Sequence, residues 1–211
     1  MKAKVHRMTD AVSRRLSSRG RPSGSTKSTA KPSPYSYKQL MSEKSFLKVA
    51  SRAARVQGFS LLSVDYLADS TGIELRYLVN SVERPGVKYN VVLRIDSLSP
   101  DSLVSRPTSQ VATLLRMSGI KVYCSCPAFL YWGYQYKAEH RNYAAFKLGV
   151  RYPKIRNPHL QGFICKHTYA CLSVTSAMWG KYAKMLKDHI SESRAAEVQD
   201  SLQRALKQIK L

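Results

Sequence analysis

The chain has 211 residues, with 35 Lys or Arg against 13 Asp or Glu, and a formal net charge of +22. A pI near 10.1 indicates an anionic partner, such as nucleic acid, an acidic protein surface or anionic lipid, and 44% hydrophobic residues are enough for a buried core. No apolar run approaches the roughly 20 residues that span a bilayer, and residues 1–10 lack the apolar stretch of a secretory signal, so we expect neither a spanning helix nor secretion.

Residues 1–44 are rich in Ser, Gly, Pro, Lys and Arg, and carry eleven basic residues against Asp10 and Glu43. Few apolar residues are present to offset the entropy of ordering, so we predict a basic flexible arm. The arm is either a solubilising tail or a segment that follows a phosphate backbone or enters an assembly. Its Arg- and Ser-rich composition also resembles a mitochondrial transit peptide. The candidate contact residues in the arm are Arg14, Arg15, Arg19 and Arg21.

The next segments predict a helix and an antiparallel sheet. Apolar spacing favours a helix over 45–57 that ends at Gly58. Strands are predicted over 60–68, 72–82 and 87–95, with a turn at 83–86 between the last two. Alternating apolar residues in these strands indicate a hairpin or meander with one buried face. Residues 97–109 contain two prolines and several serines and are predicted to form a loop, followed by a short helix over 110–117 and a strand over 119–123.

The C-terminal part of the chain is predicted to be helical. A helix starts at Cys165 and is expected to break at Gly180, and a last helix runs from Ser191, its predicted N-cap, to Ile209. The apolar stripe of this last helix consists of Ala195, Val198, Leu202, Ala205, Leu206 and Ile209.

Two short motifs contain the candidate metal ligands. Cys124-Ser125-Cys126 and Cys165-Lys166-His167 together supply three thiols and one imidazole, the set that a closed tetrahedral zinc site uses. The four cysteines of the chain are also compatible with two disulfides or with reduced core thiols. Nothing indicates secretion and a Cys-x-Cys pair bridges poorly to itself, so zinc is favoured, with Cys124, Cys126, Cys165 and His167 as ligands.

The remaining Cys and His residues near these motifs have simpler interpretations. Cys171 lies four residues after His167 on the same helical face and is predicted to be a core thiol. His140 and His159 are expected at the surface or facing a partner, with replacement of His167 as a ligand as the alternative.

The segment between the two motifs is aromatic and basic. Trp132 and Tyr134, with Lys137 and Arg141, are candidates for a stacking and charge platform for single-stranded nucleic acid; alternatively, the aromatic residues pack a small core over the metal. Lys154 and Arg156 lie in a short basic stretch between two prolines, which is either a contact with phosphate or a protein partner, or a structural brace.

Residues 87–176, approximately, resemble the SWIM-type zinc finger. The shared order is a strand, a Cys-x-Cys turn, a loop and a Cys-x-His motif at the start of a helix. The resemblance is carried by Val122-Tyr123-Cys124-Ser125-Cys126-Pro127 and by Phe163-Ile164-Cys165-Lys166-His167-Thr168, and it implies Zn²⁺ on the four ligands. The 38-residue loop 127–164 is longer than is usual in that family. Residues 129–134 and 155–158 also resemble small SWIM-type proteins of large tailed bacteriophages, which implies a virion or nucleoprotein component.

Together these observations predict an α+β protein with a small antiparallel sheet, a zinc knuckle and helices. The expected parts are the arm 1–44, an α+β domain over 45–178 with a zinc core at 119–178 and the long loop 127–164, and a helical segment over 179–211. Catalysis and a small-molecule substrate are not expected, because four protein ligands leave the metal no open position and the few carboxylates show no pairing.

The function expected from the sequence is a zinc-stabilised module that contacts DNA or another polyanion without reading its sequence. The expected location is a virion or the host cytoplasm, with the nucleus or mitochondrion as alternatives. The alternative function is an assembly component whose arm and C-terminal helix dock on neighbouring protein subunits.

Overall fold

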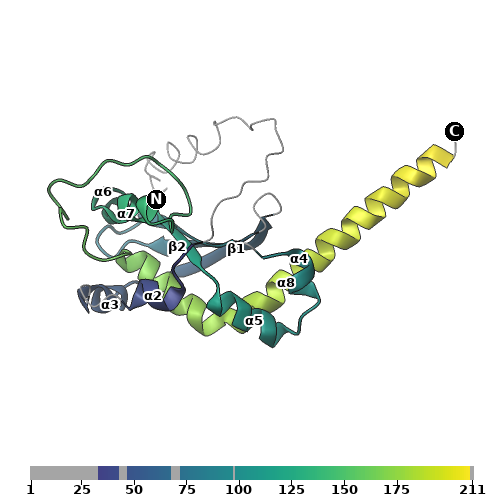
Figure 1. Cartoon of the computed structure of the whole chain (residues 1–211), viewed down its shortest axis with the longest axis horizontal. Coiled ribbons are helices and arrows are strands. Elements are labelled where there is room, and N and C mark those ends of the chain that lie inside the picture. The colour runs from purple at the N-terminus through teal and green to yellow at the C-terminus, as the bar shows by residue number, and fades with distance from the viewer. Residues whose placement is uncertain (1–32, 43–46, 68–71, 97, 210–211) are drawn as a thin grey trace.

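A computed structural model describes residues 33–42, 47–67, 72–96 and 98–209 of the chain (Figure 1). Its four strands form one antiparallel sheet in the order β1-β2-β3-β4, and helices pack against it, which confirms the α+β class and the antiparallel sheet. The strands are β1 (Phe59–Leu67), β2 (Gly72–Asn80), β3 (Lys88–Ile95) and β4 (Ile120–Cys124). The helices are α2 (Tyr37–Met41), α3 (Leu47–Ala53), α4 (Pro100–Val104), α5 (Thr108–Met117), α6 (Pro127–Tyr131), α7 (Tyr134–His140) and α8 (Lys166–Ile209).

The alternating apolar residues of the central strands form the buried face of the sheet. Ile73, Leu75, Tyr77 and Val79 of β2 are all buried, and their partners in β3 are buried as well. Residues at every second position of a strand share a face, so this register places all of these side chains on one side. The predicted meander with one buried face is therefore confirmed.

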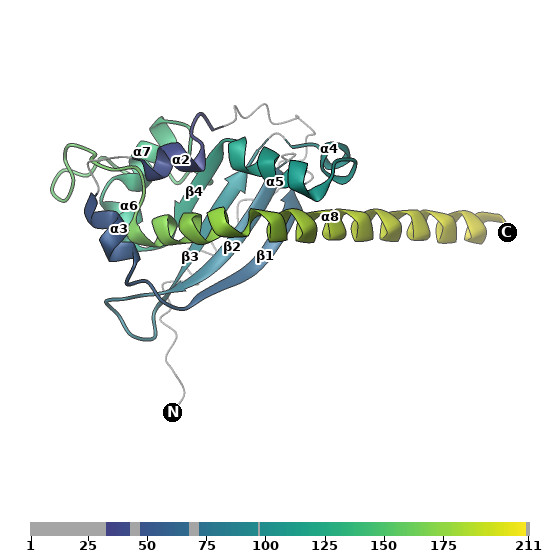
Figure 2. The same ribbon diagram turned by 90° about the horizontal axis from the view of Figure 1, so that it is seen from below.

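Helix α8 covers this buried face and runs across the strands (Figure 2). The hydroxyl of Tyr77 lies 2.7 Å from Thr175 Oγ1 and donates to the hydroxyl of Tyr182 at 3.0 Å, so the centre of the sheet is bonded to two positions about two turns apart on the helix. The buried positions of α8 recur every three or four residues as far as Ile190. This part of α8 is an amphipathic helix whose apolar stripe closes the main core.

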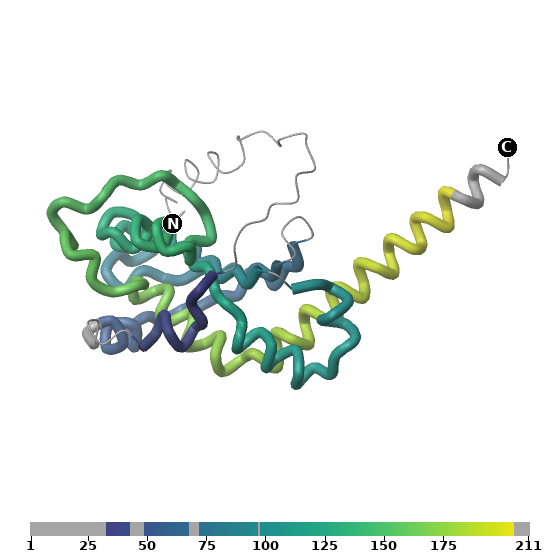
Figure 3. The backbone as a smooth tube through the Cα atoms, viewed as in Figure 1, coloured from purple at the N-terminus to yellow at the C-terminus, as the bar shows by residue number. Residues whose placement is uncertain are grey.

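The predicted helix break at Gly180 is wrong, because α8 is continuous from Lys166 to Ile209. A glycine inside a helix costs only about 1 kcal/mol, and the buried side chains of Trp179 and Tyr182 on either side offset that cost. The predicted N-cap Ser191 is consequently an interior helical residue. Beyond Ile190 the helix leaves the body of the protein and extends away from it (Figure 3).

Two predictions about irregular segments also need correction. The predicted loop 97–109 contains α4, which has Ser99 as N-cap and a proline in its first turn, and the start of α5. The predicted flexible arm ends earlier than residue 44, since Ser36 and Gln39 form a capping box on α2 and Leu40 is buried. The remainder of the arm prediction, including Arg14, Arg15, Arg19 and Arg21, concerns residues outside the described ranges.

The long loop 127–164 closes the free edge of the sheet. The Val122 N–H of β4 donates to the Tyr143 carbonyl at 2.8 Å, and the Ala145 N–H donates to the Val122 carbonyl at 3.0 Å. On the face of the sheet opposite α8, the Tyr123 ring packs edge-on against Phe129 and Phe146. An uncovered edge strand is a template for unwanted pairing, so the loop protects β4 while it carries the chain from the first motif to the second.

Within the residues that the structure describes, no helix combines the length and the apolar character needed to cross a bilayer. The 44-residue α8 is long enough, but its longest stretch without Asp, Glu, Lys or Arg is residues 167–180, which is shorter than the roughly 20 residues that a spanning helix needs.

Candidate metal centre

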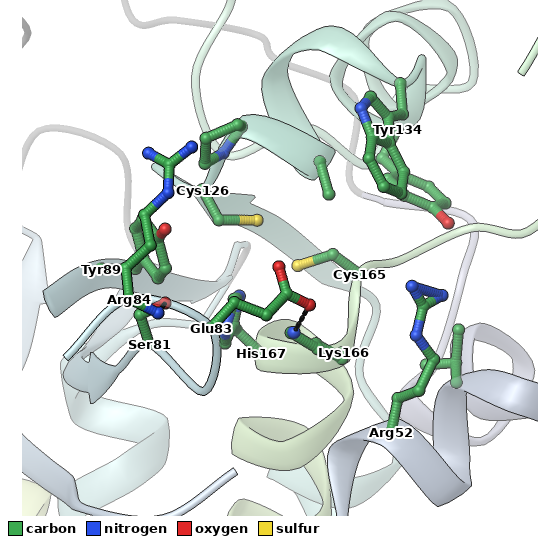
Figure 4. A pocket seen from close by; sticks show the side chains of 14 residues that line it. Arg52, Ser81, Glu83, Arg84, Tyr89, Cys126, Tyr134, Cys165, Lys166 and His167 are labelled. Atoms are coloured by element: carbon green, nitrogen blue, oxygen red, sulfur yellow. Dashed lines mark hydrogen bonds and ion pairs between the residues drawn. The ribbon is translucent and has the colours of Figure 1, made fainter. Parts of the chain in front are cut away.

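The structure brings the four predicted ligands into one buried cluster. Cys124 is the last residue of β4, Cys126 is the N-cap of α6, Cys165 immediately precedes α8, and His167 lies in its first turn. Their ligand atoms all lie within 4.8 Å of one another, and all four side chains are buried. In Figure 4 the sulfur atoms of Cys126 and Cys165 face each other above His167.

The local sequence explains how the first pair of thiols is held. Pro127 occupies the first turn of α6, where its missing N–H costs nothing, so the chain turns into a helix directly after Cys126. Cys126 Sγ then accepts the Phe129 N–H at 3.4 Å, and Cys124 Sγ accepts the Cys126 N–H at 3.5 Å. Hydrogen bonds from N–H groups stabilise thiolates, which is the state in which sulfur binds a metal.

His167 is the most informative residue of the cluster. Its side chain is 3% exposed, and neither ring nitrogen has a hydrogen-bond partner among the described residues. The imidazole packs against Tyr89, with 4.9 Å between the ring centroids. A buried polar atom without a partner costs about 1–3 kcal/mol, and an ion among the three thiols would provide the missing partner of one ring nitrogen.

The thiols influence one another strongly. Burial raises the pKa of the Cys124 and Cys126 thiols, and the neighbouring Cys165 raises both pKa values further. Burial acts against ionisation of Cys165 too, but the neighbouring side chains of Cys124, Cys126 and His167 outweigh burial and hold the pKa of Cys165 well below its ordinary value.

The donor set and its compactness fit zinc. Zinc–sulfur bonds of about 2.3 Å in a tetrahedral site place the sulfurs about 3.8 Å apart, which is inside the 4.8 Å limit of this cluster. Three thiolates and one imidazole complete the tetrahedron, so the arrangement suits a structural ion. The cluster could thus hold a metal ion, and its chemistry is compatible with zinc.

The other Cys and His residues lie outside the cluster. Cys171 is fully buried one turn further along α8, as predicted for a core thiol, and burial raises the pKa of its thiol. His140 is exposed, with its Nδ1 2.8 Å from the Tyr136 carbonyl, and His159 is also exposed.

The predicted contact residues of the loop divide into two groups. The Lys137 ammonium is buried, donates to the Leu160 and Gly162 carbonyls at 3.1 and 2.9 Å, and lies 4.0 Å from the centre of the Phe163 ring. Tyr134 is likewise buried, stacked with Phe129. These two side chains hold the loop together, so we leave them out of any proposed contact surface.

The second group lies at the surface. Arg141, Lys154 and Arg156 are exposed, and the guanidinium of Arg156 lies 5.8 Å from the centre of the half-buried Trp132 ring. A further set of polar residues surrounds a pocket beside the Cys₃His cluster, and no sequence pattern predicts this set because its members come from separate segments. These residues are Arg52, Ser81, Glu83, Arg84 and Lys166.

The fold and the site together define an α+β protein with a buried Cys₃His cluster that could hold a metal ion. Comparisons of the chain with protein-family models, with curated proteins and with solved structures found no significant match.

Proposed function

We propose that the protein is a non-enzymatic binding module in which Zn²⁺ on Cys124, Cys126, Cys165 and His167 fixes a basic surface for contact with DNA or another polyanion. The orphaned, buried His167 among three thiols is the observation that supports the metal most directly. The sequence resemblance to SWIM-type zinc fingers agrees with that ligand set. A closed set of protein ligands leaves no position for a substrate, which supports a structural ion over a catalytic one.

The outer surface of the long loop supports the polyanion partner. Its single acidic residue, Glu139, is held inside the loop by the Leu148 N–H at 2.7 Å and the Gly149 N–H at 3.2 Å. The exposed charges that remain on the loop are therefore all positive. They belong to Arg141, Lys147, Arg151, Lys154 and Arg156.

Salt dependence tests this function. About five phosphate contacts would weaken binding to duplex DNA roughly 500-fold between about 50 and 200 mM salt, because each contact releases condensed counterions. Replacing Arg141, Lys154 and Arg156 with Gln should flatten that dependence, as measured by fluorescence anisotropy. The matched control replaces the exposed residues Arg116, Lys181 and Lys184 with Gln, which gives the same net charge. Equal losses in the two variants, or a flat salt response of the unmodified protein, would contradict the proposed surface.

The resemblance to small bacteriophage proteins supports a role for the protein in a virus particle or another nucleoprotein particle. We propose a structural component of a virion or nucleoprotein, located in the virion or the host cytoplasm. Mass spectrometry of purified particles would detect the chain if this is correct.

A second candidate function, assembly with neighbouring subunits, is favoured by the projecting end of α8. Val198 and Leu202 are each 60% exposed there, and the apolar spacing 195-198-202-205-209 follows the three-four repeat of a helix pair. Residues 191–211 carry a net charge of +1, although the chain carries +22. Residues 191–201 are net acidic and residues 202–211 are basic, so a second copy of the chain in antiparallel orientation matches opposite charges.

Sedimentation velocity tests this self-association. The unmodified protein should shift from monomer to dimer as its concentration rises, and Leu202→Asp should keep it monomeric by placing a charge in the apolar seam. Gln203→Asp adds the same charge to the neighbouring exposed position, outside the seam, and should leave the dimer intact. A protein that stays monomeric at all concentrations would rule out this pairing.

A further inference from the structure

A hollow of about 150 Å³ lies beside the metal cluster (Figure 4). It is enclosed by α3, by the turn between β2 and β3, by the knuckle at Cys126 and by the first turn of α8. Cys126, Cys165 and His167 line one side of it, so a bound ion would fix the position of that side. The hollow therefore depends on the same contacts that hold the metal centre together.

The charged lining of the hollow is mainly positive. Arg52 and Arg84 lie on opposite sides in Figure 4, and Lys166 lies between them with Glu83. With the residues that the structure describes, neither the Arg52 nor the Arg84 guanidinium makes a hydrogen bond or an ion pair. Two guanidinium groups that border a small hollow from opposite sides, without a bound carboxylate, are available to an incoming anion.

The Glu83 carboxylate already occupies part of this positive region. Its Oε1 lies 2.6 Å from Lys166 Nζ, and its side chain is 72% exposed. The hydrogen bond and the charge of Lys166 lower the pKa of Glu83, and Arg52 and His167 contribute to the same shift. An exposed ion pair of this kind is worth little on its own, so a better anion can displace the carboxylate from Lys166.

The other walls of the hollow are aromatic. The half-buried Trp132 is the aromatic side chain of this wall that a ligand can reach, and the Arg156 guanidinium lies beside its ring, whereas the buried rings of Tyr89 and Tyr134 support the wall from behind. A flat aromatic wall next to a cationic one suits a nucleotide, whose base or sugar follows directly from its phosphate. A free inorganic anion would leave that wall without a contact.

We propose that this hollow, which we name the phosphate pocket, binds a backbone phosphate of a nucleic-acid strand through Arg52, Arg84 and Lys166, with the phosphate replacing the Glu83 carboxylate on Lys166. The inference rests on the proposed nucleic-acid function and assigns a specific place to one of its contacts. The pocket would recognise the charge and shape of the phosphate group, and it has no contact that distinguishes one base from another.

The test compares two double variants of the zinc-loaded protein by fluorescence anisotropy on a short labelled oligothymidylate. Replacing Arg52 and Arg84 with Gln should weaken binding about tenfold and lower the salt slope by about one. Replacing Arg55 and Arg116 with Gln, which are exposed and outside the pocket, changes the net charge equally and should weaken binding less than about threefold. Equal losses in the two variants would overturn the pocket while leaving the nucleic-acid function in place.

A variant that is expected to strengthen binding provides a further test, because a folding defect would weaken binding. Glu83→Gln removes the competing carboxylate and should tighten binding by several-fold, whereas Glu192→Gln, on the projecting part of α8, removes one exposed acid and should not. Equal effects of these two variants would contradict displacement of Glu83 by a phosphate.

A competition experiment distinguishes a strand phosphate from a free anion. Inorganic phosphate and thymidine monophosphate are each titrated into the complex of the protein with the labelled oligothymidylate. Competition by the nucleotide at concentrations where inorganic phosphate has no effect supports the strand assignment. Equal competition by both overturns it in favour of a free anion. Failure of the unmodified protein to bind any oligonucleotide would instead overturn the nucleic-acid function itself.

Discussion

Replacing Cys165 with Ser is expected to leave the chain largely unfolded at room temperature. Cys165 lies beside the knuckle at the end of β4, so a metal ion held there would tie the start of α8 to the sheet, and the substitution removes that tie. A structural zinc site contributes about 10–16 kcal/mol of apparent binding free energy to folding, and a domain of ordinary stability has only about 5–15 kcal/mol in total. The loss of the ion is therefore comparable to the whole stability of the fold.

Circular dichroism and elemental analysis check this prediction. The unmodified protein should contain one zinc per chain under reducing conditions and should lose its cooperative melting when a strong chelator removes the metal. Cys171→Ser is the matched control, because it makes the same change at a fully buried thiol outside the cluster and should retain the ion at a cost of about 1–3 kcal/mol. A Cys165→Ser protein that melts like the unmodified one would contradict a structural metal.

The second large effect is expected at Glu74, whose side chain is completely buried on β2. It accepts hydrogen bonds from Arg94 Nε at 3.1 Å and Nη2 at 2.6 Å, and it pairs with Arg76 at 2.5 Å. Glu74→Gln removes the charge that both guanidinium groups face and leaves them with a neutral acceptor. We expect a loss of about 3 kcal/mol, near the lower end for a broken buried pair, because both arginines still reach water.

Urea unfolding of the zinc-loaded protein measures this loss. The transition midpoint of Glu74→Gln should fall while its slope stays unchanged, since the surface exposed on unfolding is the same. Glu192→Gln, which neutralises an exposed acid on α8, should change stability by less than about 0.5 kcal/mol. If both variants lost the same small amount, the Glu74 network would contribute nothing beyond a surface charge.

The sheet was predictable because its pattern is simple. The alternation Ile73, Leu75, Tyr77, Val79 can face a core only as a strand, and the turn residues 83–86 set the position of the next strand. The four ligands were predictable for a similar reason, since few other constraints explain three Cys and one His at these spacings. In both cases the decisive information is local in the sequence.

The predictions from the sequence that were wrong concern segments where tertiary packing outweighs a local preference. Gly180 is a helix breaker by propensity, but it lies between two side chains that the core requires in helical register. The short helices α2 and α4 lie in segments whose Ser- and Pro-rich composition favours irregular structure. Each nevertheless begins with a helix-capping pattern: the capping box of Ser36 and Gln39, and Ser99 followed by proline. Lys137 resembled a surface cation in the sequence, and only the folded loop supplies the two carbonyls that bury it.

The pocket beside the Cys₃His cluster could not be predicted at all. Arg52 comes from α3, Glu83 and Arg84 come from a turn, and Lys166 opens α8. No spacing rule connects segments so far apart, because their proximity is a property of the way α3 and the turn pack around the start of α8.

The unbroken course of α8 has a mechanical consequence. A helix of 44 residues is about 65 Å long, and its two parts have different surroundings: the buried Cys₃His cluster lies at the first turn, whereas residues 195–204 are exposed. Because α8 is continuous, it would keep a ligand bound beside the Cys₃His cluster at a fixed distance from a partner bound at the C-terminal end of the helix. If both proposed contacts exist, this length of helix would set a minimum distance between a polyanion bound near the cluster and a partner bound at the far end of α8.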